Sequence, residues 1–167
     1  MYRSLLMPVL AFSMVPASAH GREVGSMIEL RARCNNSSTC HFTGNTVNLE
    51  LELFNAGSDA VALPIEYYRK RGPKVVLVDN HSGKEKKLRM GPPIVHLVDQ
   101  MQVLEPGGSV RIPWSVPDHH INTFALRPVD VTAVFSFTIN PRMATVGAPS
   151  FEAKLRILDA RGEMSGH

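Results

Sequence analysis

Apolar and polar residues alternate with a period of two along most of this chain, and this pattern constrains the fold more than any other feature. The clearest run covers residues 47–53, which read VNLELEL. Because successive side chains of a strand point to opposite faces, such a run is typical of a half-buried strand. Comparable runs recur at intervals of about ten residues, the spacing of antiparallel sandwiches and barrels. We therefore predict an all-β chain that forms an antiparallel β-sandwich of about eight strands.

Turn-forming residues separate the runs, because Pro and Gly fall mostly between them. Strands are expected at 28–33, 47–53, 74–79, 86–89, 94–98, 110–116, 129–139 and 151–158. Pro113 removes one ladder hydrogen bond from its strand, which is therefore expected at a sheet edge or at a bulge. Trp114 alternates in phase with Val110 and Ile112, so we expect its side chain in the core.

The N-terminus has the three parts of a secretory signal peptide. Arg3 precedes an apolar run over residues 5–15, and the small-residue pattern of Ala17, Ser18 and Ala19 follows it. Cleavage after Ala19 would leave 148 of the 167 residues. The run is too short to cross a bilayer and no second one follows, so no membrane span is expected. We predict a periplasmic or secreted protein with a signal peptide at 1–19, a domain at 20–158 and a flexible tail at 159–167.

Two cysteines, Cys34 and Cys40, flank the polar sequence NNSST. Asn, Ser and Thr favour turns that fold the chain back on itself. In an oxidising compartment this spacing predicts a disulfide across a loop that joins two strands. A catalytic thiol or a metal site is the less favoured alternative, because redox motifs use Cys-x-x-Cys and zinc sites usually show four closely spaced ligands.

Three segments carry a resemblance to a known group of domains. They are 53–58 (LFNAGS) with Val61 and Leu63, 76–79 with a polar turn at Gly83, and 104–108 (LEPGG) with Ile112 and Trp114. In this order they resemble exported bacterial Ig-like domains, including the BsuPI-type proteinase-inhibitor domain. The resemblance implies an Ig-like β-sandwich that acts outside the cytoplasm as a binding or inhibitory module and not as an enzyme. The cysteine loop and residues 118–122 are not part of the pattern.

A strongly basic segment lies between residues 69 and 89. Its basic residues are Arg69, Lys70, Arg71, Lys74, Lys84, Lys86, Lys87 and Arg89, which we call the basic segment. Only Asp79 and Glu85 oppose them, so the segment has a net charge of +6 while the whole chain has +3. This concentration predicts contact with an anionic macromolecule, either a protein or an anionic envelope component. The neighbouring Tyr67 and Tyr68 are expected to supply aromatic anchors.

The basic segment has two alternative interpretations. In the first, the segment is a solvated hairpin whose lysines prevent pairing between sheet edges. In the second, the charges bind nucleic acid, which fits poorly because the chain is exported and no series of base-stacking aromatic residues accompanies the charges.

A copper site is the alternative function. Cleavage after Ala19 would place His20 at the N-terminus, where its α-amine and imidazole together could bind copper(II). His119 and His120 are the best candidates for a further imidazole ligand, ahead of more distant histidines. This arrangement is similar to the N-terminal histidine sites of Ig-like periplasmic copper-binding proteins and lytic polysaccharide monooxygenases. In the competing interpretation, His119 and His120 are ordinary surface residues of a loop.

Hydrolytic motifs are absent from the sequence. It has no G-x-S-x-G elbow, H-E-x-x-H pair, phosphate-binding glycine loop or EF-hand pattern. We therefore predict a non-enzymatic binding module of the inhibitor, immunity or assembly type. It has no catalytic residues and needs no cofactor, except copper under the alternative.

Overall fold

Ten strands form three sheets in the computed structural model, which describes residues 27–124, 128–143 and 148–160. About half of the described residues lie in strands and far fewer in helices, so the predicted all-β class is confirmed. The predicted signal peptide, His20 and residues 161–167 of the predicted tail lie outside the described ranges. No helix within these ranges is long and apolar enough to cross a membrane.

The first sheet has three antiparallel strands in the order β1-β3-β8. They are β1 (Ile28–Arg33), β3 (Val47–Asn55) and β8 (Ser109–Val116). Every second residue of β3 is buried, in agreement with the alternation in the sequence. Pro113 lies in β8 opposite Glu50, and β8 is an edge strand, as the missing N–H of proline predicts.

The second sheet has five strands in the order β2-β10-β9-β5-β6. They are β2 (Thr39–Phe42), β10 (Ser150–Asp159), β9 (Asp130–Thr138), β5 (Lys74–Asp79) and β6 (Glu85–Lys87). All neighbours are antiparallel except β2 and β10, which run parallel. The remaining strands, β4 (Val61–Leu63) and β7 (Gln102–Leu104), pair only with each other.

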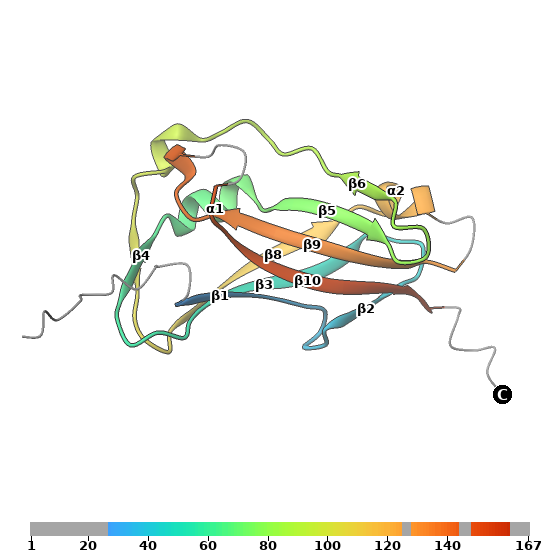
Figure 1. The fold of residues 1–167 in the computed structure, drawn as a ribbon, viewed down its shortest axis with the longest axis horizontal. Helices are drawn as coiled ribbons and strands as arrows, with labels where there is room; N and C mark the ends of the chain where they lie inside the picture. Colours follow the sequence, from blue (N-terminus) through green and yellow to red (C-terminus); the bar gives the residue numbers. More distant parts are fainter. Residues whose placement is uncertain (1–26, 125–127, 144–147, 161–167) are drawn as a thin grey trace, which may run out of the picture.

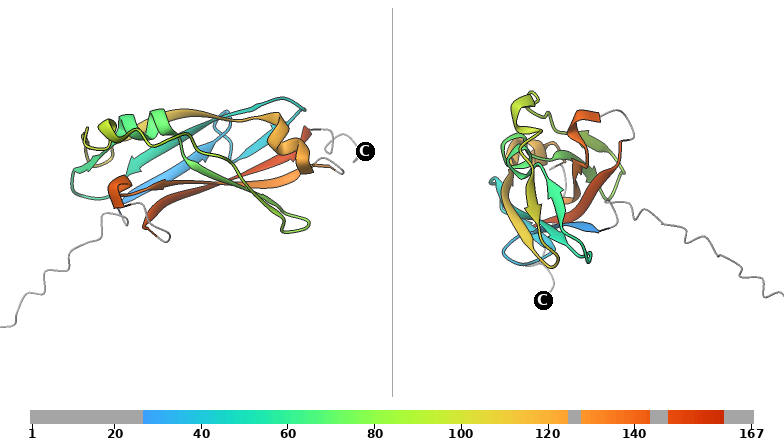
Figure 2. Two further views of the ribbon diagram at one scale, coloured as in Figure 1. Left: turned by 90° about the horizontal axis from the view of Figure 1, so that it is seen from above. Right: turned by 90° about the vertical axis from the view of Figure 1, so that its left-hand side faces the viewer.

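The core lies between the two larger sheets, which form two layers of the molecule (Figures 1 and 2). Leu51 and Leu53 from β3 and Ala133 and Phe135 from β9 are completely buried there. Burial of a large apolar side chain contributes about 1.5–3 kcal/mol, so these alternating rows supply much of the stability.

Several segments differ from the sequence-based expectation, among them residues 94–98, 65–71 and 118–121, where a helix replaces the expected loop. Residues 94–98 were predicted to be a strand, but Val95–Leu97 form a 3-10 helix, η2, and the Val95 side chain is 72% exposed. The run has no sheet to pair with, and its apolar residues do not alternate between core and solvent. Residues Ile65–Arg71 form helix α1, for which no helix was predicted.

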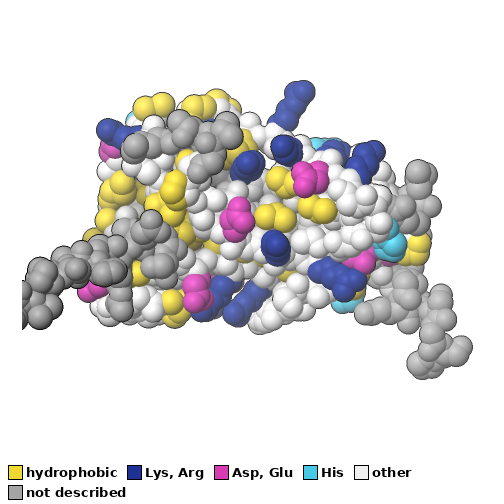
Figure 3. Space-filling model, viewed as in Figure 1, with side chains coloured by type: hydrophobic (Ala, Val, Ile, Leu, Met, Phe, Trp, Pro, Cys, Tyr) yellow, Lys and Arg dark blue, Asp and Glu magenta, His cyan; other side chains and the backbone are white. Residues whose placement is uncertain are grey.

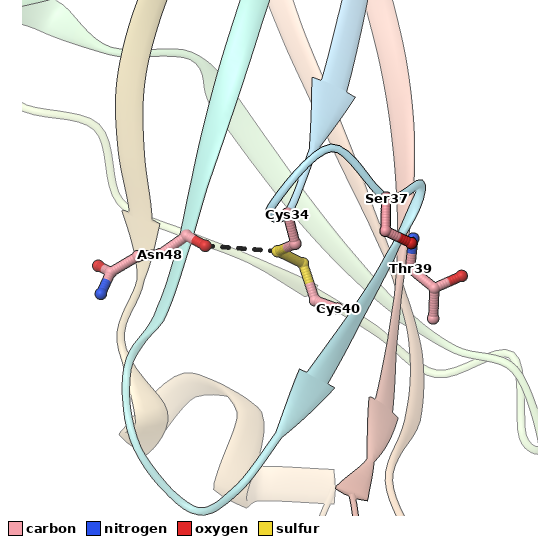
Figure 4. Close-up of a disulfide and its surroundings, with 5 residues drawn as sticks. All are labelled: Cys34, Ser37, Thr39, Cys40 and Asn48. Carbon is pink, nitrogen blue, oxygen red and sulfur yellow. Dashed lines mark hydrogen bonds between the residues drawn. A yellow bond between two sulfur atoms is a disulfide. The ribbon is translucent and has the colours of Figure 1, made fainter.

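The predicted disulfide joins Cys34 to Cys40, whose Cα atoms are 5.4 Å apart (Figure 4). Within the loop, Cys34 and Ser37 exchange backbone hydrogen bonds of 2.8 and 2.7 Å. Asn35 and Asn36 between them both have positive φ, as a two-residue hairpin turn of this kind requires. The loop leads from β1 in one sheet to β2 in the other, and such a small covalent loop contributes about 2 kcal/mol.

Candidate functional site

The basic segment extends over three structural elements. Arg69, Lys70 and Arg71 form the last turn of α1, where cations complement the helix dipole. Lys74 opens β5, and the other four basic residues lie in or next to the β5–β6 hairpin. Gly72, with φ of 77° and ψ of 174°, then ends the helix, in a region of conformational space that is essentially restricted to glycine.

Tyr67 and Tyr68 are not surface anchors, which corrects the sequence-based assignment. Their exposures are 8% and 1%. The Tyr68 ring packs against Phe137 with centroids 4.7 Å apart, and its hydroxyl donates to the Thr138 carbonyl at 3.0 Å. This burial raises the pKa of Tyr68. The helix brings both tyrosine rings inward at this point, and Tyr68 attaches α1 to β9.

Most cations of the basic segment have no acidic partner. Arg69 forms an ion pair with Glu66, one turn earlier in α1. The other seven have no carboxylate within ion-pair distance in the described part of the chain. Their charge is therefore not neutralised locally and is available to an anionic partner.

The strand register divides these cations between two sides of the hairpin. Lys87 aligns with Val76 on the outer face of the five-stranded sheet, whereas Lys86 aligns with the buried Leu77. Lys86 points toward the end of α2 (Asp118–Ile121), and its Nζ lies 3.5 Å from Oγ1 of Thr123. The basic segment is therefore not one continuous surface.

The outer face also carries charges that were not among the predicted site residues. Lys154 and Arg156 of β10 lie on it, and the guanidinium of Arg156 contacts Asp130 at 2.7 Å. Figure 3 shows basic and acidic side chains interspersed over this face. The alternation within residues 151–158 (FEAKLRIL) could have predicted this position. Lys154 and Arg156 alternate with buried apolar residues of the strand, so their side chains point away from the core.

Arg71 and Arg89 meet at a cavity of about 260 Å³. It lies between the end of α1 and residues 88–91 on one side, and the end of β8 with α2 on the other. Four of its lining residues have side chains with nitrogen atoms: Arg71, Arg89, Trp114 and His120. In Figure 1 the segment that follows β6 runs along the upper edge of the molecule, from beside α2 toward the side on which α1 lies. No carboxylate is among the residues that line the cavity.

Two contacts fix the orientation of Arg71. Its Nη1 donates to the carbonyl of Gly91 at 2.9 Å, and its guanidinium carbon lies 5.9 Å from the centroid of the Tyr67 ring. Tyr67 is therefore a support for a basic side chain. The other N–H groups of Arg71 make no hydrogen bond to a described residue, so they are available to a ligand.

Trp114 is only half-buried, although it joins the edge of the core as predicted. Its indole nitrogen Nε1 is shielded from solvent and has no hydrogen-bond partner among the described residues. The same holds for Nδ1 of His120. Buried polar atoms are nearly always paired, so two unpaired ring nitrogens beside one cavity call for a physical explanation.

The histidines of the alternative copper site are placed only in part. The rings of His119 and His120 have centroids 4.0 Å apart in α2. Burial, then His119 and Lys86, lower the pKa of His120. His20 lies outside the described ranges, and inside them no three His, Cys, Asp or Glu residues form a group that could hold a metal.

Comparison with known proteins identifies no family for this chain. No family model matches it, and no curated protein matches it. Among solved structures, a β-glucosidase from Erythrobacter marinus has a TM-score of 0.35 at 8% identity, covering 77% of this chain and 15% of the glucosidase. The Northeast Structural Genomics Consortium target SoR45 has a TM-score of 0.34 at 10% identity, covering 80% and 84% of the two chains.

A third structure is the alkylpurine DNA glycosylase AlkC of Pseudomonas fluorescens, bound to DNA with an abasic site analog. It has a TM-score of 0.33 at 11% identity, covering 78% of this chain and 30% of the glycosylase. The chain thus spans a minor part of both named enzymes. Similarities this weak support no inference about function.

Proposed function

We propose that this chain is an exported, non-enzymatic binding module that contacts an anionic macromolecule through its basic segment. The partner is an acidic protein or an anionic component of the cell envelope. The scaffold is an Ig-like β-sandwich of the kind found in BsuPI-type domains, and its compartment is the periplasm or the extracellular space. The observation that carries the proposal is the set of seven cations between residues 70 and 89 that have no carboxylate partner among the described residues.

Electrostatics explains why unpaired cations favour this function. At physiological ionic strength the Debye length is about 8 Å, so each exposed cation attracts a polyanion at short range. Lys70 and Lys84 are exposed and have no carboxylate partner among the described residues. Neither contributes to the core, so their charges are free to serve an interaction.

Charge reversal tests the proposal directly. The variants Lys70→Glu and Lys84→Glu are compared with Arg33→Glu, which reverses an exposed charge on β1 in the other sheet. Retention on immobilised polyglutamate and on vesicles with anionic phospholipid is measured between about 50 and 500 mM salt, which changes the screening length severalfold. We expect weaker retention and a flatter salt dependence for the first two variants only. Equal losses in all three, or none, would contradict the proposal.

A further inference from the structure

The cavity beside Arg71 and Arg89 has the features of a binding site for a small ligand. We propose that it binds a carboxylate carried on a compact apolar group. This inference goes beyond the binding of a polyanion and does not depend on it, because a small acid can occupy the cavity whether or not a macromolecule contacts the basic segment.

The positive charge of the cavity indicates an anionic ligand. Two arginines line it, and its lining contains no carboxylate that could neutralise them. Arg71 is held by Gly91 and Tyr67, so its donors are already oriented before a ligand binds. Arginine donors arranged in a planar fork match the two oxygens of a carboxylate.

The unpaired ring nitrogens indicate a ligand with hydrogen-bond acceptors. Nε1 of Trp114 can only donate, and Nδ1 of His120 can donate in one neutral tautomer. The two side chains come from β8 and α2, and both line the cavity opposite the arginines. Both nitrogens are shielded from solvent, so a ligand oxygen in the cavity becomes their partner when the Trp114 or His120 ring turns toward it.

The remaining walls of the cavity are apolar and determine which apolar group of the ligand fits. They include Pro73, Val75, Leu88 and Met90. A volume of about 260 Å³ is just below the usual range for small-molecule sites, so it suits a branched aliphatic group better than an extended chain. The Met90 side chain is 39% exposed and sits at this wall, where its flexible thioether can adapt to a ligand.

Trp114 is the only tryptophan in the chain, so it reports directly on occupancy. The protein without residues 1–19 is titrated with two acids. One is N-acetyl-leucine, which mimics a peptide C-terminus, and the other is 4-methylpentanoate, a free organic acid. The indole N–H resonance and the tryptophan fluorescence are recorded. Both acids are expected to shift these signals, whereas N-acetyl-leucinamide and 4-methylpentanamide should bind at least about tenfold more weakly, because they lack the charge.

Matched variants separate this site from the basic segment as a whole. Arg89→Gln and His120→Ala should each weaken binding of the acids about tenfold, the equivalent of one charge-assisted hydrogen bond. Lys84→Glu changes a cation that does not line the cavity. It should bind the acids as the parent protein does, even if it loses retention on polyglutamate.

The relative affinity of the two acids identifies the source of the carboxylate. Tighter binding of N-acetyl-leucine supports the C-terminus of a peptide, and tighter binding of 4-methylpentanoate supports a free acid. Failure of both acids to shift the Trp114 signals would overturn the proposal, as would equal binding of the amides. An unchanged affinity in both Arg89→Gln and His120→Ala, with folding verified by thermal melting, would also overturn it.

Discussion

The indole of Trp114 packs directly on the backbone of Gly72, so closely that a Cβ atom built on Gly72 would lie 2.0 Å from Cη2 of Trp114. This contact joins the end of α1 to the edge strand β8. It also forms one boundary of the region in which Arg71 and the cavity are placed. Gly72 is thus required for two reasons, its backbone conformation and the space that the indole occupies.

The Gly72→Ala substitution should destabilise the protein by more than about 3 kcal/mol. An L-residue in this backbone region costs about 1–3 kcal/mol, and overpacking against Trp114 adds a similar amount. Urea unfolding followed by tryptophan fluorescence measures the loss. Gly83→Ala is the matched control, because Gly83 has φ of 70° but no atom near its Cβ position. Equal losses in both variants would show that the indole contact contributes nothing.

Asn55 provides a second test of the architecture. Its side chain is completely buried, and its Nδ2 donates to the carbonyls of Asp59 and Leu104 at 2.8 and 2.9 Å. Its Oδ1 accepts from the backbone N–H of Gly57 at 3.0 Å. Asn55→Ala leaves these groups unpaired, so the free energy of unfolding should fall by about 3 kcal/mol.

The control for this variant is Asn48→Ala on the same strand, where the side chain is exposed. Its free energy of unfolding should change by less than about 0.5 kcal/mol, as is usual at surface positions. A comparable loss in both variants would contradict the role assigned to Asn55.

The strands were predictable because their pattern comes from physics that acts locally. The alternation over 47–53 and the asparagines of the cysteine loop specify a half-buried strand and a tight turn without reference to distant residues. Helix α1 was not predicted, although Glu66 in its first turn and Gly72 after its last turn are typical helix signals. Its single turn of apolar residues is too short to show a period of 3.6, and tyrosine also favours strands.

The cavity could not be predicted from the sequence. Arg71, Arg89, Trp114 and His120 come from separate elements, and only the packing of α1 and α2 against β8 brings them together. The charge pattern identified the two arginines as candidate contacts. Nothing in the local sequence indicated that Trp114 and His120 would lie near these arginines, each with a ring nitrogen that has no partner among the described residues.

The buried hydroxyl of Tyr68 should make stability depend on pH in alkaline solution. Burial raises its pKa above the ordinary value of 10.0, so the folded protein keeps this proton while the unfolded chain loses it. The free energy of unfolding should therefore fall as the pH rises above about 10. Tyr68→Phe lacks the hydroxyl, which costs about 1 kcal/mol at pH 8 through the lost hydrogen bond to Thr138.

The parent protein and Tyr68→Phe should differ less in their free energy of unfolding at pH 11 than at pH 8, by about 1 kcal/mol. Only the unfolded chain of the parent loses a proton from residue 68 over this range. Chemical denaturation at both pH values measures the difference. A constant difference would show that Tyr68 ionises equally well in the folded state.

The Asp130–Arg156 pair should make stability depend on pH in acid. The hydrogen bonds from Arg156 lower the pKa of Asp130 to about 2, with a further contribution from Asn80 and partial opposition from burial. The folded state therefore binds this proton less readily than the unfolded chain, whose carboxyl has the ordinary value of 3.8. The stabilisation is complete above about pH 4 and should be lost as the pH falls toward 2.

Replacing Arg156 by Gln tests this dependence. The side chain of Arg156 is 55% exposed, so its removal should lower the free energy of unfolding only slightly at pH 7, and this difference should shrink as the pH falls toward 2. NMR titration of the Asp130 carboxyl should show its pKa rising toward the ordinary value. Lys154→Gln, on the same sheet face but without an ion pair among the described residues, should leave that titration unchanged. If Asp130 titrates identically in Arg156→Gln and in the parent, then Arg156 is not the cause of its acidity.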